Sequence, residues 1–272
     1  MTDANKNLVL RIVSALVLLP VVLFLLWYSP LTTGILGALG AAGLAYEYYT
    51  IVFKKLDPAL VGGILASAAL PLCFALWPDR YAAGVVVGTG ALTILAFSYY
   101  LLRGPLPEAP LRVAFLVTGV AYCGLLLSTL SGLRPMQDGL GWIILALAVT
   151  WGNDTAAYAA GRALGKHKLY PAVSPGKTWE GFFGGALGSV GCAFVVKALM
   201  LPTLSPLGVL AVALPCSVLG PIGDLCESML KRAYQVKDSG KIIPGHGGLL
   251  DRVDALLFNL PYVWLYASVL AS

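Results

Sequence analysis

The residues best suited to chemistry lie in one polar segment, 224–254, of an otherwise apolar chain. The segment reads DLCESMLKRAYQVKDSGKIIPGHGGLLDRVD and contains ten of the 31 charged side chains and one of the two histidines among 272 residues. Long apolar stretches flank it on both sides, so its acids, lysines and glycines are expected at the edge of a membrane. Ionisable groups are costly at such a place, and this concentration of them therefore predicts a functional site.

The first candidate group is a helix face that begins at Asp224. On a helix, Asp224, Glu227, Ser228 and Lys231 follow one another at steps of three or four and therefore share one face. That face could present a carboxylate, a hydroxyl and a cation to one ligand. The alternative is the amphipathic last turn of a helix that emerges into water. Two glycines in the preceding turn favour a ligand or a second helix beside Asp224, because they permit close approach.

The second candidate group is the glycine-rich run 244–254. Its three glycines in four positions permit backbone geometries that bring N–H groups close to a phosphate. Asp251 and Asp254, three positions apart, can point the same way at the start of a helix. Such oxygen ligands suit Mg²⁺, which commonly binds one or two carboxylates together with substrate phosphates. The alternative is favourable charge at a helix N-terminus, and His246 alone is more typical of a loop hydrogen-bonding residue.

The third candidate group lies upstream, in Asn153-Asp154 and in the run SPGKTWEG at 174–181. An unpaired carboxylate inside an apolar stretch is expensive, so Asp154 should lie near a cation, a metal or a lysine. The GKT tripeptide resembles the end of a phosphate loop, but a Walker motif would need glycine where Pro171 stands, which excludes an ATPase of that type. Glu47, in the second apolar stretch, is a further candidate site residue. An equally good alternative is that Glu47 is a buried hydrogen-bond partner with a structural role.

The elements that must position these residues are membrane helices. Hydrophobic residues make up 58% of the chain, charged residues 11%, and mean hydropathy is +0.83, whereas soluble domains have roughly 45–50% and about 25%. We predict an all-α, polytopic transmembrane bundle that forms a single integral membrane domain, with N-terminal helices in 1–138 and C-terminal catalytic helices and cytoplasmic loops in 139–272. About nine spans near the length needed to cross hydrocarbon are expected at 8–28, 31–53, 60–77, 81–102, 112–130, 139–160, 181–201, 205–225 and 253–270.

The basic residues predict the orientation, because cytoplasmic loops collect Lys and Arg. With the N-terminus in the cytoplasm, 15 of the 18 basic residues fall on the cytoplasmic side, and only Arg80, Arg134 and Lys197 lie on or toward the outside. This arrangement also places the polar segments 161–180 and 227–252 in the cytoplasm. The net charge of +5 then suits anionic headgroups or nucleotides. The five cysteines are scattered without CxxC spacing, so they indicate neither a zinc site nor a disulfide framework.

The run 228–254 carries a family resemblance. Its pattern Ser-x-Leu-Lys-Arg-x4-Lys-Asp-x-Gly-x2-Ile-Pro-x-His-Gly-Gly-Leu-x-Asp-Arg-Val-Asp resembles the motif of the phosphatidate cytidylyltransferase (CDP-diacylglycerol synthase) family at every defined position. The upstream polar segments resemble it too, so the similarity covers about the C-terminal half, and the first five spans match mainly in hydropathy. The resemblance implies transfer of CMP from CTP to phosphatidate, giving CDP-diacylglycerol and pyrophosphate for phospholipid biosynthesis.

The resemblance also implies the site. Asp224 and Asp251 would bind Mg²⁺, with Asp254 as a further metal ligand and a second cation such as K⁺ beside it. Phosphates of CTP or the lipid would be neutralised by Lys231, Arg232, Lys237 and Arg252. The nucleotide loop would be shaped by His246, Gly247 and Gly248. Further substrate-binding residues would be Asn153, Asp154, Lys177, Thr178 and Glu180. The implied protein is multi-pass, lies in the cell (inner) membrane if bacterial, binds membrane lipid but no nucleic acid, and forms a homodimer.

Two other classes of membrane protein share some of these features. A CDP-alcohol phosphotransferase should show DGxxAR followed by GxxxDxxxD, and the chain has neither. A secondary transporter would explain intramembrane acids through ion coupling, but it predicts repeated halves with interrupted helices. The sequence shows no internal repeat, and its polar motifs crowd into the C-terminal half. The sequence therefore favours the enzyme.

Overall fold

The computed structural model describes residues 3–243, 245 and 247–270, except for the side chains of 3–13, 15 and 270. The chain divides into two compact units. The first unit comprises Met1–Gly132 and Asp238–Asp251, and the second comprises Leu133–Lys237 and Arg252–Ser272. The polar loop 238–251 therefore belongs to the unit of the N-terminal helices, although it follows the second unit's helices in the sequence.

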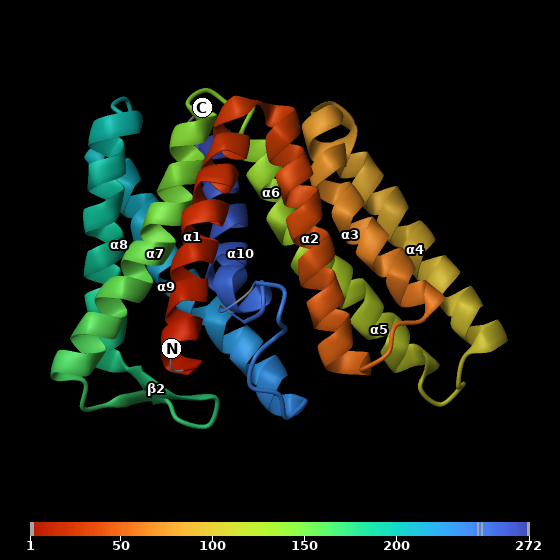
Figure 1. Cartoon of the computed structure of the whole chain (residues 1–272). Coiled ribbons are helices and arrows are strands. Elements are labelled where there is room, and N and C mark those ends of the chain that lie inside the picture. Colours follow the sequence, from red (N-terminus) through yellow and green to blue (C-terminus); the bar gives the residue numbers. More distant parts are fainter. Residues whose placement is uncertain (1–2, 244, 246, 271–272) are drawn as a thin grey trace. The chain divides into compact units, whose positions relative to one another are not determined.

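The first unit is helical (Figure 1). Its first four helices are α1 (Asp3–Tyr28), α2 (Pro30–Phe53), α3 (Pro58–Leu76) and α4 (Tyr81–Arg103), and the 3₁₀ turn η1 (Pro78–Arg80) precedes α4. Helix α5 (Ala109–Gly119) continues through the π-helical segment η2 (Val120–Leu125) into α6 (Leu126–Leu133). Side-chain caps set the starts of two of them. Ser29 Oγ accepts a hydrogen bond from Thr32 N at 3.1 Å before α2, and Asp57 Oδ1 accepts one from Leu60 N at 3.0 Å before α3. Such caps satisfy N–H groups that have no partner inside the helix.

The core of the first unit is built around α2. Tyr49 is fully buried, and its hydroxyl donates to the carbonyl of Leu116 at 2.7 Å. Gly63 of α3 and Gly119 of α5 lie so close to this ring that a Cβ on either would come within 2.5 Å of it. These close approaches fix three helices around one tyrosine, and they hold the C-terminal turns of α2 in place.

The second unit contains the remaining elements. They are α7 (Gly139–Leu164), β1 (Lys168–Tyr170), β2 (Ser174–Thr178), α8 (Trp179–Met200), α9 (Pro206–Ala233) and the part of α10 (Leu250–Leu265) from Arg252 onward, which continues into η3 (Tyr266–Leu270). Small residues join α7 to α8. A Cβ on Gly188 would lie 2.4 Å from Ala156 Cβ and 2.5 Å from the carbonyl oxygen of Gly152. The small-residue face of α8 therefore packs within one chain, and the predicted homodimer stays a prediction.

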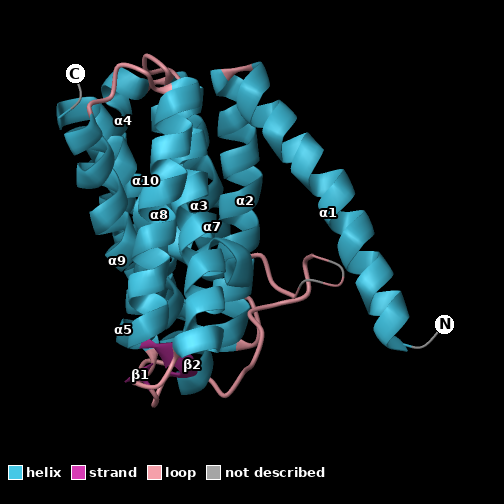
Figure 2. Ribbon diagram, turned by 90° about the vertical axis from the view of Figure 1, so that its left-hand side faces the viewer, coloured by secondary structure: helices cyan, strands magenta, loops and turns pink. Residues whose placement is uncertain are grey.

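A short hairpin departs from the all-α prediction. Strands β1 and β2 pair antiparallel, with Lys168 opposite Thr178 and Tyr170 opposite Ser174, and Figure 2 shows them at the end of the helices α7 and α8. From the sequence this segment is expected only as a polar loop, because strands of three and five residues carry almost no periodic signal. Thr178 ends the hairpin and caps α8, since its Oγ1 accepts a hydrogen bond from Gly181 N at 3.1 Å.

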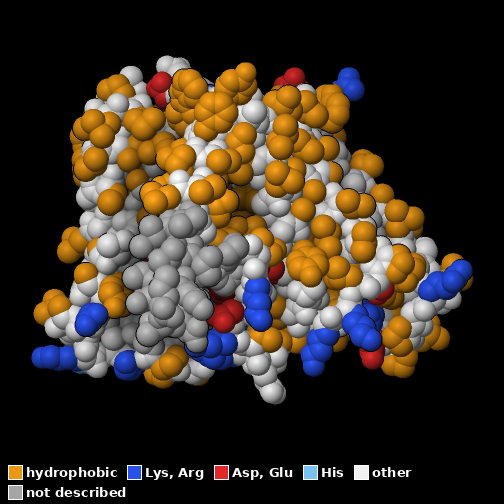
Figure 3. Space-filling view, in the orientation of Figure 1, with side chains coloured by type: hydrophobic (Ala, Val, Ile, Leu, Met, Phe, Trp, Pro, Cys, Tyr) orange, Lys and Arg blue, Asp and Glu red, His pale blue; other side chains and the backbone are white. Residues whose placement is uncertain are grey.

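The described residues include six helices long and apolar enough to cross a membrane. They are Pro30–Phe53, Pro58–Leu76, Pro78–Arg103, Ala109–Leu133, Trp179–Met200 and Pro206–Ala233. The other three predicted stretches are helical as well, but α10 has only 16 residues, and α1 contributes the shorter apolar part Leu16–Tyr28. Apolar side chains cover most of the face drawn in Figure 3, and most of the Lys and Arg visible there lie along its lower edge. Nine spans and a cytoplasmic N-terminus stay predictions.

Candidate functional site

Asp224 is held by a lysine from the hairpin. Lys177 Nζ, on β2, lies 2.7 Å from Asp224 Oδ2, and the two side chains are 24% and 36% exposed. The same ammonium group donates to the backbone carbonyl of Pro221 at 3.3 Å, one turn earlier on α9. Two contacts from one cation thus place the hairpin against the middle of α9, and they leave the carboxylate of Asp224 accessible.

Two further carboxylates lie within electrostatic reach of Asp224. Asp154 on α7 and Asp254 on α10 each repel its charge, and they also repel one another. Lys177 offsets part of the charge of Asp154, as the sequence analysis expected for an acid inside an apolar stretch. Three carboxylates that repel one another make a site that favours an additional positive charge.

Small residues on α9 permit this concentration of acids. A Cβ on Gly223 would lie 2.5 Å from the backbone oxygen of Asp254, and a Cβ on Gly220 would lie 3.1 Å from Asn259 Nδ2. The backbone of α10 therefore passes directly against α9 beside Asp224. The predicted role of these two glycines, close approach of another helix, is confirmed.

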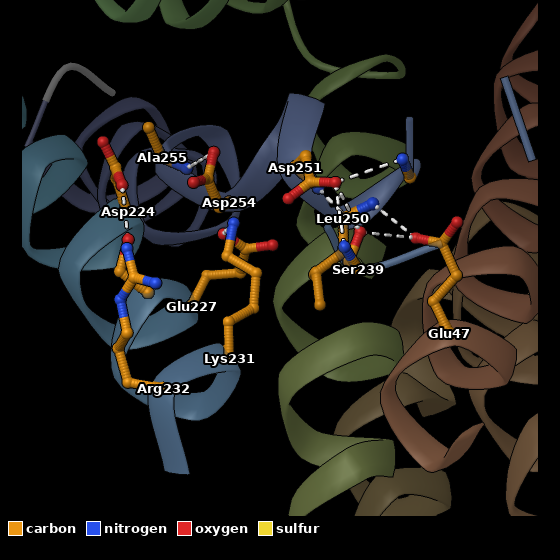
Figure 4. A network of polar contacts seen from close by, with 12 residues as sticks. Glu47, Asp224, Glu227, Lys231, Arg232, Ser239, Leu250, Asp251, Asp254 and Ala255 are labelled. Atoms are coloured by element: carbon orange, nitrogen blue, oxygen red, sulfur yellow. Dashed lines mark hydrogen bonds and ion pairs between the residues drawn. The ribbon is translucent and has the colours of Figure 1, made fainter. Parts of the chain in front are cut away.

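The prediction that Asp224, Glu227, Ser228 and Lys231 share one helix face is confirmed by contacts between side chains four positions apart. Ser228 Oγ lies 3.3 Å from Asp224 Oδ1. One step further, Lys231 Nζ forms an ion pair with Glu227 Oε2 at 2.5 Å, and Glu227 is only 1% exposed. Lys231 also interacts favourably with the charge of Asp254. Figure 4 shows Lys231 reaching along α9 toward Glu227 and Asp254.

A pocket of about 580 Å³ opens beside Asp224 within the second unit. Its polar lining includes four residues singled out from the sequence: Asn153, Asp154, Lys177 and Thr178. Asn153 is 3% exposed and donates to Ser189 Oγ at 3.2 Å, so it also ties α7 to α8. The structure thus brings the upstream motifs together with Asp224, as the sequence analysis expected.

Glu180 has a different neighbour. Its carboxylate lies 2.6 Å from His167 Nδ1 and accepts hydrogen bonds from His167 N at 3.3 Å. Glu180 thereby ties the first turn of α8 to the start of the hairpin, and it is not among the pocket-lining residues in the described part of the chain. The basic residues predicted from the motif lie at the surface: Arg232, Lys237 and Arg252 are exposed. His246 lies outside the described residues.

Asp251 makes its described contacts within the first unit. Its Oδ2 accepts hydrogen bonds from Ser239 N at 3.0 Å, from Ser239 Oγ at 3.0 Å and from Gly248 N at 3.1 Å. Gly247 has φ +85°, in the left-handed region that glycine tolerates. Ser239 and Gly248 therefore both contact Asp251, and the N–H of Gly248 already has a protein acceptor. The pairing of Asp251 with Asp224 as metal ligands stays a prediction.

Glu47 and Ser239 belong to the same cluster (Figure 4). Glu47 is fully buried in α2, and its carboxylate accepts hydrogen bonds from Ser239 Oγ at 3.1 Å, Leu249 N at 3.0 Å and Leu250 N at 2.8 Å. The sequence flagged Glu47 as an acid inside an apolar stretch, and the alternative of a buried hydrogen-bond partner is confirmed. Ser239 was missed, since a serine in a polar loop carries no distinguishing signal.

The donor atoms suit Mg²⁺. In the described part of the chain, no three His, Cys, Asp or Glu side chains are grouped closely enough to bind a metal by themselves. Mg²⁺ does not require such a group, because it commonly takes one or two carboxylates and completes its shell with water and substrate phosphates. Asp224 and its acidic neighbours Asp154 and Asp254 have carboxylate oxygens of the kind that Mg²⁺ binds, and their charges repel one another. The residues therefore fit the ion that the motif implies.

The chain is similar to known proteins along almost its whole length. The profile of the cytidylyltransferase family matches residues 9–270. A phosphatidate cytidylyltransferase of Bacillus subtilis is 33% identical over 278 aligned positions, which cover 99% of each chain. A phosphatidate cytidylyltransferase of Staphylococcus epidermidis is 41% identical over 64% of this chain and 66% of its own, and one of Staphylococcus haemolyticus is 45% identical over 54% and 56%. The similarity thus extends well beyond the C-terminal half in which the motif lies.

Proposed function

Because the chain belongs to the cytidylyltransferase family, we propose that it is a phosphatidate cytidylyltransferase that makes CDP-diacylglycerol and pyrophosphate from CTP and phosphatidate. The observation that carries this proposal is the group of acids around Asp224, paired with Lys177 beside a pocket of about 580 Å³. A pocket that combines carboxylates with an ammonium group suits a polyphosphate bound together with a divalent cation.

The proposed reaction needs no nucleophile from the protein. A phosphate oxygen of phosphatidate attacks the α-phosphorus of CTP, a new P–O bond forms, and the bond from the α-phosphorus to the bridging oxygen breaks. Pyrophosphate leaves with the bonding electrons. The protein's contribution is to orient two polyanionic groups and to offset their charge, which are the main sources of rate enhancement in such transfers.

The residues of the second unit have distinct parts in this proposal. Lys177 and Lys231 are cations held close to carboxylates, and in this proposal each offsets phosphate charge. Asp224 and Asp254 would bind Mg²⁺, which when bound neutralises phosphate oxygens. Asp251 would be a further metal ligand, which the sequence motif alone supports, and a second cation such as K⁺ is part of the same proposal.

The membrane setting agrees with the substrates. Phosphatidate reaches the enzyme from the bilayer, whereas CTP is soluble. The bias of 15 basic residues to 3 supports a multi-pass protein of the cell membrane with its N-terminus and its polar segments in the cytoplasm, where both substrates meet. A homodimer is the proposed assembly.

The direct test is incorporation of radiolabel from [α-³²P]CTP into lipid by the purified protein in phosphatidate-containing micelles. Label should enter the lipid phase with Mg²⁺ and should fall to background when EDTA is added or phosphatidate is omitted. Release of pyrophosphate in equal amount should accompany it. Absence of labelled lipid from folded protein under these conditions would refute the proposed activity, whereas persistence in EDTA would refute only the metal dependence.

A further inference from the structure

Glu47 is an acid that the reaction outlined above does not use. It lies in α2 and is 0% exposed. Its hydrogen-bond donors are residues about 200 positions later in the chain. Oε1 accepts from Leu249 N, and Oε2 accepts from Leu250 N and Ser239 Oγ. A buried carboxylate in an apolar helix is expensive unless its hydrogen bonds are made. Here the loop 238–251 supplies all three.

These three contacts anchor both ends of the loop. Ser239 is the loop's second residue, and Leu249 and Leu250 are at the start of α10. The first N–H groups of a helix have no partner within the helix, and a negative charge beside them is stabilising. Glu47 supplies that charge from another helix, so it closes the loop against α2 and fixes where α10 begins.

The loop backbone is packed directly on the carboxylate of Glu47. A Cβ on Gly240 would lie 2.2 Å from Glu47 Oε1, and a Cβ on Gly248 would lie 2.8 Å from Glu47 Oε2 and 1.8 Å from Ser239 Oγ. Glycine is needed at both positions because no side-chain atom fits there. The contact is therefore built into the loop's sequence as well as into α2.

A single hydroxyl links Glu47 to Asp251. Ser239 Oγ lies 3.1 Å from Glu47 Oε2 and 3.0 Å from Asp251 Oδ2, and Ser239 N donates to the same Asp251 oxygen. Figure 4 shows Ser239 lying between the two carboxylates. The hydroxyl has only one proton to donate, so Glu47 and Asp251 compete for it, and the direction of the O–H bond depends on both carboxylates. Displacing Glu47 therefore alters the surroundings of Asp251.

We propose that Glu47 is a positioning residue, which orders the loop 238–251 and, through Ser239, orients Asp251 without touching substrate. This inference rests on the proposed function, and it takes the assignment of the loop to CTP binding from the family resemblance. When a binding loop is ordered in only a fraction of the molecules, apparent affinity falls by that fraction, while the rate at saturation is retained. Loss of Glu47 should therefore act mainly on KM for CTP.

The test compares Glu47→Gln with the matched control Glu108→Gln. Glu47→Gln replaces one carboxylate oxygen by an amide N–H₂ group. This group cannot accept a hydrogen bond from the N–H and O–H donors of the loop, so at least one of the contacts is lost. Glu108 belongs to the same unit, and its side chain is 60% exposed beside Arg112, so the same chemical change there leaves the loop intact. Hydrogen–deuterium exchange by mass spectrometry and steady-state kinetics are measured on both full-length proteins.

In Glu47→Gln, peptides covering 238–251 should exchange about tenfold faster, which is the effect of one lost charge-assisted hydrogen bond. Peptides from α3 should be unchanged. KM for CTP should rise about tenfold with kcat within about threefold of the wild type, and Glu108→Gln should match the wild type in every measurement. If Glu47→Gln does not fold, Ser239→Ala removes one contact and should shift the same two readouts in the same direction.

Three results would overturn the inference: unchanged exchange in 238–251, uniformly faster exchange throughout the protein, or a fall in kcat with KM for CTP unchanged. The second result would make Glu47 a general stability residue. Failure of the wild type to label lipid would instead overturn the proposed function. The exchange measurement needs no turnover, so it still decides whether Glu47 orders the loop.

Discussion

The substitution Asp224→Asn separates the chemistry of the acidic group from its contribution to the fold. It keeps the size of the side chain and removes its charge. In the structure this breaks the ion pair with Lys177, whose Nζ lies 2.7 Å from Asp224 Oδ2, and it also relieves repulsion from Asp154 and Asp254. These two effects on stability have opposite signs.

The expected change in stability is small. The two partners of the ion pair are 24% and 36% exposed, and ion pairs accessible to water contribute roughly 0–1 kcal/mol. Relief of like-charge repulsion offsets part of that loss, so the free energy of unfolding should change by at most about 1 kcal/mol. Loss of a group that stabilises transition-state charge typically lowers kcat by about 10²–10³, or about 3–4 kcal/mol. Activity and stability should therefore respond very differently.

The assay is lipid labelling from CTP with Mg²⁺, alongside thermal unfolding of the same preparation. Asp224→Asn should lose at least about 99% of turnover with little change in melting temperature. Asp138→Asn is a matched control in the same unit, because Asp138 is exposed and makes no side-chain cap hydrogen bond at the start of α7. More than about a tenth of wild-type activity in Asp224→Asn would contradict the metal role, and a large fall in melting temperature would contradict the estimate of stability.

Three other substitutions test separate parts of the structure. Lys231→Met removes the cation from Glu227, which is 1% exposed, and should cost about 3–5 kcal/mol of stability; an unchanged melting temperature would show that Glu227 does not need Lys231. Gly248→Ala places a Cβ 1.8 Å from a loop hydroxyl and should cost about 1–3 kcal/mol, whereas Gly62→Ala in α3 meets nothing within 4 Å and should be neutral or slightly stabilising by thermal unfolding. Asp251→Asn should abolish lipid labelling while the protein stays folded, and near-normal labelling would remove Asp251 from the metal site.

Local patterns in the sequence were sufficient for the helices and for one face of the site. Each predicted apolar stretch is helical in the described residues, because the length of an apolar run and the Pro, Gly and charged residues that end it act through neighbouring positions. The steps of three and four from Asp224 to Lys231 likewise act within one helix, and the contacts Ser228–Asp224 and Lys231–Glu227 follow from them. Local patterns were not sufficient to identify the hydrogen-bond and ion-pair partners of the acids.

Long-range partners were decided only by the tertiary structure. Lys177 reaches Asp224 from a hairpin 47 positions earlier, and Glu180, from the same motif, turns to His167 instead. The sequence does not show which partner Asp224 and Glu180 will have, since pairing depends on which segments lie side by side in the fold.

The same contrast holds for the polar loop. By itself the sequence determined that this protein is a helical membrane protein and a member of its family, and it located the acids, because hydropathy and motif spacing are local properties. Only the tertiary structure decided that Glu47 binds Ser239, Leu249 and Leu250. Those contacts join residues 192–203 positions apart, and they arise because a buried carboxylate must find hydrogen-bond donors wherever the packing brings them.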